Sequence, residues 1–565
     1  MDVQTDFKSL FADALKKSVG EDLWTQEMER LIEQPKNSAY GDLSFPCFQL
    51  AKHFRKPPQE IAVKLANAIH DPAFEKVEAL GPYVNAFFDR KSFGSRVVNR
   101  ILREKGNYGS WSFGEGKTIV LDFSSPNIAK PFSMGHLRST VIGSALANIC
   151  EKAGYRTVKI NHLGDWGTQF GKLISAYKRW GSEEKIKANP IPELFRLYVR
   201  FHEEEKANPA LTEEGRGWFK RLEDGDEEAV RLWKWFRDVS LEEFQRIYRL
   251  LEIGFDEYTG ESFYNDKMDA IARQLEEKGL LVTSDQAEVV MLEEEGLPPC
   301  LIRKSDGATT YATRDLAAGV YRYQTYRFAK ALYVVGHEQS VHFKQVFKVL
   351  EKMGNPWAKD MVHVPFGLYL KNGKKMSTRK GRVILLEEVL EEAIRQALKN
   401  IEAKNPRLEN KEEAAKMVGV GAVVFHDLKS HRMNNIEFSL EDMLNFEGET
   451  GPYVQYAFAR ACSVLRKSGE ETFAFSGLKD GESWEIVKRL HAFPEKVLQA
   501  FNGYDPSVIA KYVLDLAKAF NKYYGAVRIL ETDEERPSRL ALVKAITIVL
   551  EEGLRLLGIK APEQM

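Results

Sequence analysis

The chain has 565 residues, of which 44% are hydrophobic and 29% are charged, and its formal net charge is −1. This length predicts roughly three or four domains, and the composition excludes a low-complexity or disordered polypeptide. The near-zero charge excludes binding of a polyanion by an overall positive field, so a nucleic acid would have to be held by local basic patches.

An N-terminal α/β domain is predicted over residues 1–115. It begins with an amphipathic helix, continues with a second helix after Pro57-Pro58, and includes an aromatic strand over 83–88. The glycine-rich stretch 106–116 is predicted to be a linker.

A doubly wound parallel sheet is predicted over residues 116–385, because strand and helix patterns alternate along this part of the chain. The stretch 181–250 is dense in Glu, Lys, Arg and Trp and has no strand pattern, which indicates a helical insertion. Ligands of such sheets bind at the carboxyl ends of the strands. The predicted strands are 118–123, 157–161, 288–292, 331–335 and 361–365.

The remainder of the chain is predicted to be helical, with a connecting segment over 386–446 and an all-α bundle over 447–565. In the bundle, Asp505-Pro506 is typical of a helix cap and first turn, and another helix follows Pro537. The predicted fold class is therefore α/β, with a doubly wound parallel-sheet domain between an N-terminal α/β domain and a C-terminal helical bundle.

Neither a membrane span nor a metal site is predicted. No apolar run approaches the ~20 residues that a bilayer span needs, and the first residues lack a basic segment followed by an apolar one, which favours a cytoplasmic location. The four cysteines lie far apart without a C-x-x-C pair, so neither a zinc ribbon nor a disulfide framework is expected. They are Cys47, Cys150, Cys300 and Cys462.

The sequence Ser133-Met134-Gly135-His136 is predicted to lie where a strand turns into a helix. A helix N-terminus offers free backbone N–H groups and a partial positive charge, both of which favour phosphate binding. Gly135 lets a phosphate approach the backbone closely, and His136 can donate a hydrogen bond to a phosphate oxygen. We therefore expect the phosphates of ATP at this turn.

A second candidate phosphate-binding segment is the basic stretch 371–382. Its cations surround Asn372-Gly373, a turn pair that predicts a flexible loop able to close over a pyrophosphate. Because such a run is more often a solvated surface, the interpretation depends on its combination with the turn at 133–136. The cations are Lys371, Lys374, Lys375, Arg379, Lys380 and Arg382.

Five motifs follow one another along the chain. They are residues 125–130 (Ser-Pro-Asn-Ile-Ala-Lys) before the 133–136 turn, 161–167 (Asn-His-Leu-Gly-Asp-Trp-Gly), 311–315 (Tyr-Ala-Thr-Arg-Asp), Lys375-Met376-Ser377, and 451–456 (Gly-Pro-Tyr-Val-Gln-Tyr). In this order they resemble the class I aminoacyl-tRNA synthetases, and among them the arginyl-tRNA synthetase family, along essentially the whole chain.

The resemblance implies a Rossmann-type catalytic domain that activates L-arginine with ATP and transfers it to the 3′-terminal ribose of tRNA(Arg). It also implies an N-terminal domain that contacts the tRNA D-loop and a C-terminal bundle that reads the anticodon. Magnesium is expected to accompany the ATP, activation to need bound tRNA, and the protein to be a monomer.

Two positions depart from the family pattern. The phosphate motif usually begins with a histidine, whereas this chain has Ser133, which can donate a hydrogen bond but carries no charge. The second motif usually has a lysine where this chain has Thr378, so either Arg379 or Lys380 is expected to supply the cation.

For the nucleotide, residues 336–339 (Gly-His-Glu-Gln) match, with Glu for Asp, the family pattern that holds the adenosine ribose. The resemblance implies that Lys130 meets the amino-acid carboxylate or the α-phosphate. The residues expected to bind ATP are Gly135, His136, Gly336, Glu338, Gln339, Lys375, Met376, Ser377 and Arg379. The residues expected to act in catalysis are Lys130, Ser133, His136 and Lys375.

Arginine requires an acidic pocket, because its guanidinium offers five donors and is costly to bury unpaired. Tyr311 and Asp315 are four residues apart at the start of a helix pattern and so share a face. The resemblance implies that they hold the guanidinium; the alternative is a capping or surface Asp beside a core Tyr. The further residues expected to bind arginine are Asp122, Asn127, His162, Glu261 and Gln339. A capping role for Asp122 and an exposed loop position for Glu261 are the alternatives for those two.

For the tRNA, the family pattern implies that Tyr83 and Asn85, which alternate onto one strand face, read a D-loop base. A half-buried aromatic strand is the alternative. Tyr453, Tyr456 and Arg460 are expected to contact anticodon bases, although packing explains aromatic side chains in this helix equally well.

Two rival functions stay open at this point. One is another class I ligase, which the missing zinc-ligand cysteines and the Tyr311 and Asp315 pair disfavour. The other is a tRNA-binding protein without ligase activity, which the departures at Ser133 and Thr378 leave open. The presence of Asn127, Lys130, His136 and Lys375 disfavours it.

Overall fold

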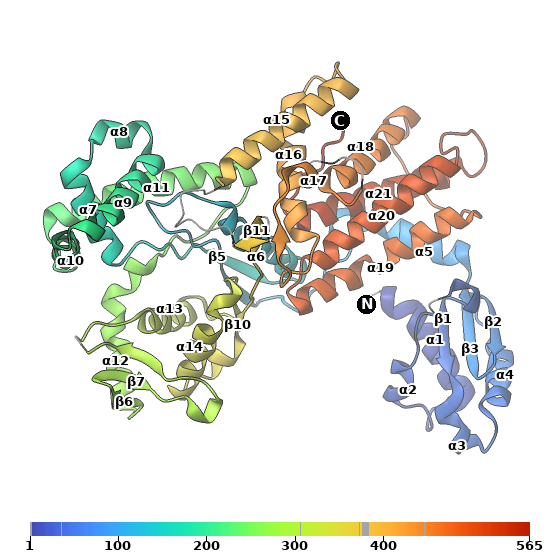
Figure 1. The fold of residues 1–565 in the computed structure, drawn as a ribbon. Helices are drawn as coiled ribbons and strands as arrows, with labels where there is room; N and C mark the ends of the chain where they lie inside the picture. The colour runs from blue at the N-terminus through green and yellow to red at the C-terminus, as the bar shows by residue number, and fades with distance from the viewer. Residues whose placement is uncertain are drawn as a thin grey trace.

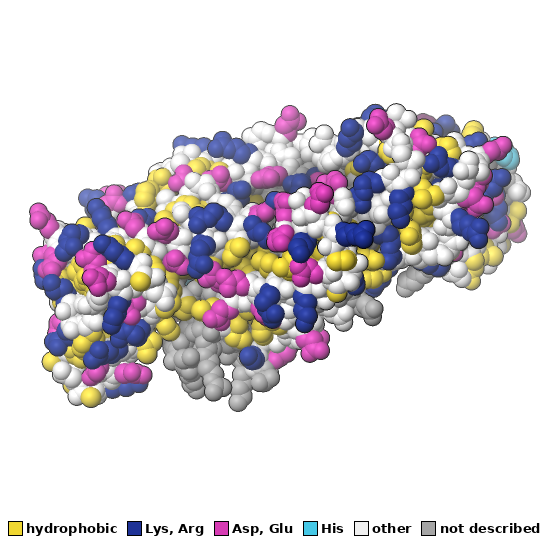
Figure 2. All heavy atoms as spheres, turned by 90° about the horizontal axis from the view of Figure 1, so that it is seen from above, with side chains coloured by type: hydrophobic (Ala, Val, Ile, Leu, Met, Phe, Trp, Pro, Cys, Tyr) yellow, Lys and Arg dark blue, Asp and Glu magenta, His cyan; other side chains and the backbone are white. Residues whose placement is uncertain are grey.

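The computed structural model describes residues 3–35, 37–305, 307–371, 373–375, 384–443, 445 and 448–565. Figure 1 shows the N-terminal module and the helical insertion on opposite sides of a central region that holds the parallel sheet. Basic and acidic side chains are interspersed over the face shown in Figure 2, in line with the net charge of −1. Among the helices of the described residues, none is long and apolar enough to cross a membrane.

The N-terminal module is a three-stranded antiparallel sheet, in the order β1-β3-β2, covered by helices. The predicted strand over 83–88 is confirmed as β3, whose Val84, Ala86 and Phe88 face the core. The second predicted helix begins at Pro58, where the missing N–H of proline costs no hydrogen bond. The elements are α1 (Val3–Val19), α2 (Gln26–Arg30), β1 (Leu43–Pro46), α3 (Ala51–Phe54), α4 (Pro58–Ala68), β2 (Phe74–Leu80), β3 (Tyr83–Phe88) and α5 (Arg90–Glu104).

The glycine-rich stretch 106–116 is anchored to the C-terminal helix α19 (Gly481–Gly503). Pro494 lies inside α19 and has no N–H, so the carbonyl of Leu490 lacks its helical donor. The buried Tyr108 hydroxyl donates to this carbonyl at 3.0 Å, and Trp111 Nε1 donates to the Pro494 carbonyl at 3.1 Å. The predicted linker therefore packs against the bundle.

The central sheet has four parallel strands in the order β10-β9-β4-β5. They confirm the predicted strands over 118–123, 157–161, 331–335 and 361–365. Ile119, Val120 and Leu121 of the inner strand β4 are fully buried, as expected for a sheet covered on both faces. The elements are β4 (Thr118–Asp122), α6 (Met134–Lys152), β5 (Arg156–Ile160), α13 (Tyr311–Tyr326), β9 (Lys330–Tyr333), α14 (Ser340–Lys352) and β10 (Met361–His363).

The predicted parallel strand over 288–292 is wrong in its pairing. Residues Ala287–Val290 form β7 of a separate antiparallel sheet with β6 (Leu281–Ser284) and β8 (Cys300–Arg303). The turn residues Asp285 and Gln286 both have positive φ, 48° and 63°, the backbone conformation of a two-residue hairpin. A local hairpin therefore takes up this strand and keeps it out of the parallel sheet.

The predicted helical insertion over 181–250 is helical in the structure. Helices α7 and α10 approach closely, because a Cβ on Gly171 would lie 2.1 Å from the carbonyl oxygen of Gly215. The elements of this region are α7 (Thr168–Trp180), α8 (Glu183–Ala188), α9 (Pro190–Ala207), α10 (Ala210–Glu223), α11 (Glu227–Leu251) and α12 (Met268–Glu277).

β11 (Tyr369–Lys371) and β12 (Lys374–Lys375) pair antiparallel, with Lys371 opposite Lys374; Asn372 of the predicted turn lies outside the described residues. Gly373 has a φ of 69°, which such a turn requires. β11 also pairs parallel with β13 (Ile436–Glu437). The connecting segment predicted as helical thus contains a strand, too short to produce a sequence period, besides α15 (Leu386–Lys404), α16 (Lys411–Leu428) and α17 (Leu440–Met443).

The C-terminal part is a helical bundle, as predicted. The Asp505 carboxylate accepts hydrogen bonds from the N and Oγ of Ser507 and so caps the predicted helix start. The helix expected after Pro537 begins one residue earlier. The helices are α18 (Gly451–Ser468), α19, α20 (Ser507–Ala526) and α21 (Arg536–Leu556).

Candidate active site

The 133–136 turn lies at the start of α6, as the sequence predicts. Ser133 is the N-cap, and its backbone N–H donates to Nδ1 of His136 at 3.1 Å in a reciprocal capping arrangement. Because Nδ1 accepts this bond, the ring proton lies on Nε2, which is left to donate to a ligand. Burial, and secondly the charge of Lys130, lower the pKa of His136 to about 4. His136 is therefore a neutral donor at pH 7.

Residues 384–386, which follow the basic stretch, lie directly against this turn. The Met134 N–H donates to the carbonyl of Ile384 at 3.2 Å, and the Leu386 N–H donates to the carbonyl of Phe132 at 3.0 Å. Lys375 is described by its backbone in β12. Met376, Ser377 and Arg379, like Thr378 and Lys380, lie outside the described residues. The fold thus brings the described residues that follow the second motif to the first motif.

Residues 336–339 follow β9, the strand next to β4. The connection from β4 leads outward to β5 and the connection from β9 leads outward to β10, so the crevice between the two loops is a topological switch point. The His337 N–H donates to the carbonyl of Phe366 at 3.1 Å. A Cβ on Gly336 would lie 2.5 Å from the Glu338 carboxylate, so the Glu338 side chain rests directly over Gly336. Glu338 and Gln339 are exposed.

Glu261 supplies an acidic group with an incomplete set of partners. Its backbone N–H donates to the carbonyl of Leu163 at 2.9 Å, which places it beside the loop after β5. Among the described residues its buried Oε2 has no hydrogen-bond partner. Burial, together with the charges of Asp165 and Asp315, raises the pKa of Glu261 to about 7, although Arg314 and a hydrogen bond from the Trp166 amide lower it. A buried carboxylate of this kind is an acceptor prepared for a cationic ligand.

Tyr311 and Asp315 lie in the first turns of α13, on one face as predicted. Tyr311 is 61% exposed, whereas Asp315 is half-buried and accepts a 2.6 Å hydrogen bond from Nε2 of His342 on α14. Burial alone would raise the pKa of Asp315, but the bond and charge of His342 lower it on balance. His342 was not among the expected site residues, because no sequence pattern links it to Asp315.

Asp122 and His162 surround a buried arginine of the protein itself. Asp122 Oδ2 lies 2.7 Å from Nη1 of Arg322, and its Oδ1 accepts from the Ser125 hydroxyl at 3.1 Å. His162 Nδ1 lies 3.4 Å from Nη2 of Arg322, and burial lowers the pKa of His162. Arg322 was missed in the sequence because it sits in the middle of a helix pattern outside every motif.

Asn127 is held by the 161–167 motif. The Gly164 N–H donates to the carbonyl of Pro126, and the Ile128 N–H donates to the carbonyl of Gly164. A Cβ on Gly164 would lie 2.3 Å from Asn127 Oδ1, so the motif glycine makes room for this side chain. Lys130 lies with its ammonium 5.3 Å from the ring centroid of Tyr198 in the insertion.

The two residues predicted to read the D-loop differ in accessibility. Tyr83 is half-buried, whereas Asn85 is 2% exposed and its side-chain oxygen accepts from the Ser44 hydroxyl at 2.6 Å. In this conformation Asn85 cannot touch a ligand, because its side chain is buried and bonded to Ser44. Phe48, which the sequence reasoning missed, is 55% exposed and packs edge-on to Tyr83 at 5.9 Å.

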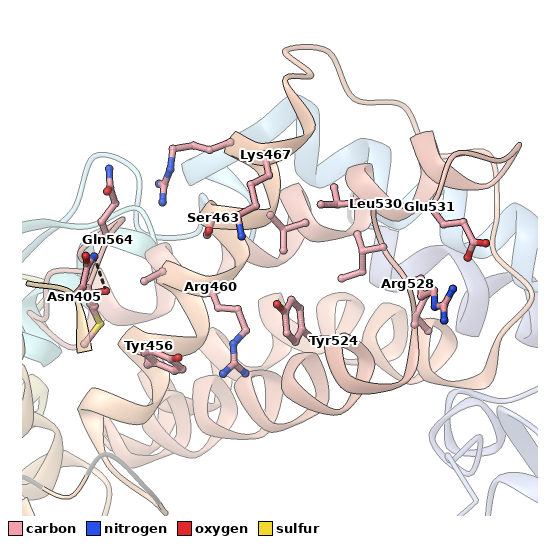
Figure 3. Close-up of a pocket in the computed structure, with 16 residues that line it drawn as sticks. Asn405, Tyr456, Arg460, Ser463, Lys467, Tyr524, Arg528, Leu530, Glu531 and Gln564 are labelled. Carbon is pink, nitrogen blue, oxygen red and sulfur yellow. Dashed lines mark hydrogen bonds between the residues drawn. The ribbon is translucent and has the colours of Figure 1, made fainter. Parts of the chain in front are cut away.

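A second site lies on the bundle, in a pocket of about 860 Å³. Figure 3 shows Arg460 between the rings of Tyr456 and Tyr524, with guanidinium-to-centroid distances of 4.8 and 5.0 Å. Lys467 and Arg528 line the same pocket. Tyr453 is half-buried and lies outside its lining. The structure thus joins two of the three predicted residues and adds Tyr524. Within the described ranges, no cluster of His, Cys, Asp and Glu is arranged to hold a metal ion.

This fold and site define a class I aminoacyl-tRNA synthetase. Residues 97–440 match the family model for tRNA synthetases class I (R), catalytic domain; residues 5–88 match the arginyl tRNA synthetase N-terminal domain, and residues 454–565 match the DALR anticodon binding domain. The chain belongs to the arginyl-tRNA synthetase family.

Relatives of this family match the chain along its full length. It is 62% identical to arginine–tRNA ligase 2 of Bacillus anthracis and 60% identical to the arginine–tRNA ligase of an Exiguobacterium species, with 99% of this chain and 100% of each relative covered. The arginyl-tRNA synthetase of Thermus thermophilus has a similar structure, with a TM-score of 0.80 at 27% identity over 99% of this chain and 100% of that one.

Proposed function

We propose that this protein is an arginine–tRNA ligase, which activates L-arginine with ATP to arginyl-adenylate and transfers it to the 3′-terminal ribose of tRNA(Arg). The observation that carries this proposal is Glu261. Its buried Oε2, which has no hydrogen-bond partner among the described residues, lies at the carboxyl edge of the doubly wound sheet. Asp315 is close enough for its charge to raise the pKa of Glu261.

The acidic pocket suits a guanidinium. A planar five-donor cation is held best by carboxylates that each bind one of its edges, and an amino acid with a neutral side chain would leave the Glu261 carboxylate without a cation. Glu261, Asp315 and the Tyr311 hydroxyl are assigned to the guanidinium. Asn127 and Gln339 are assigned to the polar end of arginine, with His162 shaping the pocket. Asp122 is assigned an indirect role, because Arg322 already occupies one of its oxygens.

The switch-point crevice is assigned to ATP. Gly135 and the Nε2–H of His136 would receive phosphate oxygens at the start of α6, and Gly336, Glu338 and Gln339 would hold the ribose. The far side of the phosphates is assigned to the segment with Lys375, Met376, Ser377 and Arg379. Ile384, which follows this segment, is hydrogen-bonded to the phosphate turn. Magnesium would enter on the phosphates of ATP rather than on protein ligands.

In the first step the arginine carboxylate attacks the α-phosphate in line, and pyrophosphate leaves. Negative charge develops on phosphoryl oxygens, so the donors of Ser133 and His136 and the cations of Lys130 and Lys375 act by position and charge. In the second step a terminal ribose hydroxyl of the tRNA attacks the carbonyl carbon of the adenylate, and AMP leaves.

The RNA is assigned to two surfaces. Tyr83, with Phe48 beside it, would stack on a D-loop base. Asn85 would contact this base only after its buried side chain becomes exposed. The pocket around Tyr456, Arg460 and Tyr524 would receive anticodon bases between a cation and two rings, a combination that holds unpaired bases without a duplex. Tyr453 is assigned a supporting position. We further propose a monomer in the cytoplasm, with the domain boundaries predicted above.

The test is ATP–pyrophosphate exchange measured with each of the twenty amino acids in turn, with tRNA(Arg) supplied. The expected result is exchange with arginine and with none of the other nineteen amino acids. Exchange with another amino acid would identify a different ligase, and absence of exchange with all of them, together with retained tRNA binding, would identify a tRNA-binding protein without ligase activity.

A further inference from the structure

Asp165, in the 161–167 motif, is a fully buried carboxylate to which no role has been given above. Its oxygens accept hydrogen bonds from the backbone N of Ser262 at 2.8 Å, from the Ser262 hydroxyl at 2.8 Å and from Nε of Arg237 at 3.2 Å. The donors come from two elements, the turn after residue 260 and helix α11. One side chain thus joins the helical insertion to the loop that contains Glu261.

The loop is held at consecutive residues on both sides of Glu261. Ser262 donates twice to Asp165, and Gly260 lies so close that a Cβ there would be 2.7 Å from the Asp165 carboxylate. The Glu261 N–H between them is bound to the carbonyl of Leu163. The backbone of residues 260–262 therefore has one position relative to the 161–167 motif, and that position determines where the Glu261 side chain points.

We propose that Asp165 is a positioning residue for arginine: through Ser262 and Gly260 it holds Glu261 toward the guanidinium pocket, and through Arg237 it ties this orientation to the helical insertion. This inference rests on the proposed function, because it takes Glu261 as the residue that meets the substrate. Asp165 itself has no surface to offer a ligand, so its effect passes entirely through Glu261.

Asp165 also acts on Glu261 through its charge. The groups that face Glu261 are Asp165, the Trp166 amide, and Tyr311, Arg314 and Asp315 of α13. Burial raises the pKa of Glu261 most, Asp165 and Asp315 raise it further, and Arg314 and the Trp166 amide lower it. Removing the charge of Asp165 therefore lowers the pKa of Glu261, and a displaced loop that exposes Glu261 lowers it in the same direction, because burial is the largest cause of the raised pKa.

The experiment compares Asp165→Asn with the unchanged protein in aminoacylation of tRNA(Arg). Because a displaced binding group costs up to about 100-fold, we expect KM for arginine to rise by about 10- to 100-fold with KM for ATP nearly unchanged. The pH at which KM for arginine reaches its lower limit should move downward. The matched control is Asp238→Asn, an exposed carboxylate beside Arg237, which should behave like the unchanged protein. A parallel rise in both KM values would overturn the inference.

A double-mutant cycle with Glu261→Gln separates positioning from general stability. If Asp165 acts through Glu261, then Asp165→Asn adds little to the loss already caused by Glu261→Gln; two losses that add would contradict the inference. Should Asp165→Asn fail to fold, Gly260→Ala replaces it, because its φ of −75° admits alanine and the three atoms nearest to the new Cβ all belong to the Asp165 carboxylate. Unchanged KM for arginine in Gly260→Ala would then count against the inference. An unchanged KM for arginine in Glu261→Gln would instead contradict the proposed role of Glu261 in binding arginine.

Discussion

Asp315 on α13 and His342 on α14 share a 2.6 Å hydrogen bond, in which Nε2 of the imidazole donates to the carboxylate. This bond keeps a half-buried carboxylate ionised at the place where we assign the guanidinium. It joins two helices that pack against each other, α13 beside the inner strand β4 and α14 beside the edge strand β10, so the pocket wall is a tertiary contact rather than a local motif.

Replacing this histidine should weaken arginine binding. A hydrogen bond to a charged group contributes about 1.5–3 kcal/mol, so His342→Ala should raise KM for arginine by roughly one to two orders of magnitude. His342→Gln retains an N–H donor and should recover part of the loss, while His53→Gln on the exposed surface of the N-terminal module serves as the control. Equal activity of His342→Ala and the unchanged protein would show that Asp315 needs no partner.

The pKa of Glu261, raised to about 7, predicts a pH dependence of arginine binding. The carboxylate must be ionised to hold a guanidinium, so KM for arginine should fall as pH rises through about 7 and then level off. Glu261→Gln should have a high KM that no longer follows pH in this range. Steady-state aminoacylation between pH 6 and pH 8.5 measures both.

The same shift predicts an effect of opposite sign on stability. Because the folded-state pKa of Glu261 lies above its ordinary value of 4.5, the folded protein binds the proton more tightly, and its free energy of unfolding falls as pH rises from 4.5 to about 7. Glu261→Gln removes this cost and should raise the free energy of unfolding by on the order of 1–3 kcal/mol at pH 8 but not at pH 4.5. Calorimetric melting at the two pH values tests this, with an equal gain at both as the contrary result.

The position of Arg460 between two aromatic rings predicts that a positive charge alone is not enough for tRNA binding at this pocket. Arg460→Lys keeps the charge but loses the planar group between Tyr456 and Tyr524, so KM for tRNA should rise by about tenfold, and more in Arg460→Ala. Exchange at saturating tRNA should change little, because this pocket is lined by none of the residues assigned to ATP or arginine. Arg395→Lys, on the exposed face of α15, is the control.

The bond between Tyr108 and the Leu490 carbonyl predicts a stability effect without a catalytic one. Tyr108→Phe leaves a carbonyl that Pro494 has already deprived of its helical donor, which should cost about 1–3 kcal/mol and lower Tm. Tyr523→Phe is the matched control: the Tyr523 hydroxyl is buried and has no hydrogen-bond partner among the described residues, so its removal should be neutral or stabilising.

Much of the fold could be predicted because it depends on local periodicity. The buried strand before residue 122, the aromatic strand at 83–88 and the long helical patterns of the bundle each carry their period within a few residues. The strand at 287–290 shows the limit of prediction from periodicity. Its residues favour a strand, but the hairpin turn at Asp285 and Gln286 pairs it with the strand just before it.

For the candidate site, the sequence by itself determined which residue types stand at the ends of the strands, and therefore that phosphate donors follow β4 and that Tyr311 and Asp315 share one helical face. Only the tertiary structure decided their partners: Arg322 for Asp122, His342 for Asp315, Asp165 for the loop of Glu261, and Tyr524 for Arg460. The physical reason is that backbone periodicity depends on neighbours a few residues away, whereas the pairing of buried charges depends on which helices the sheet order brings together.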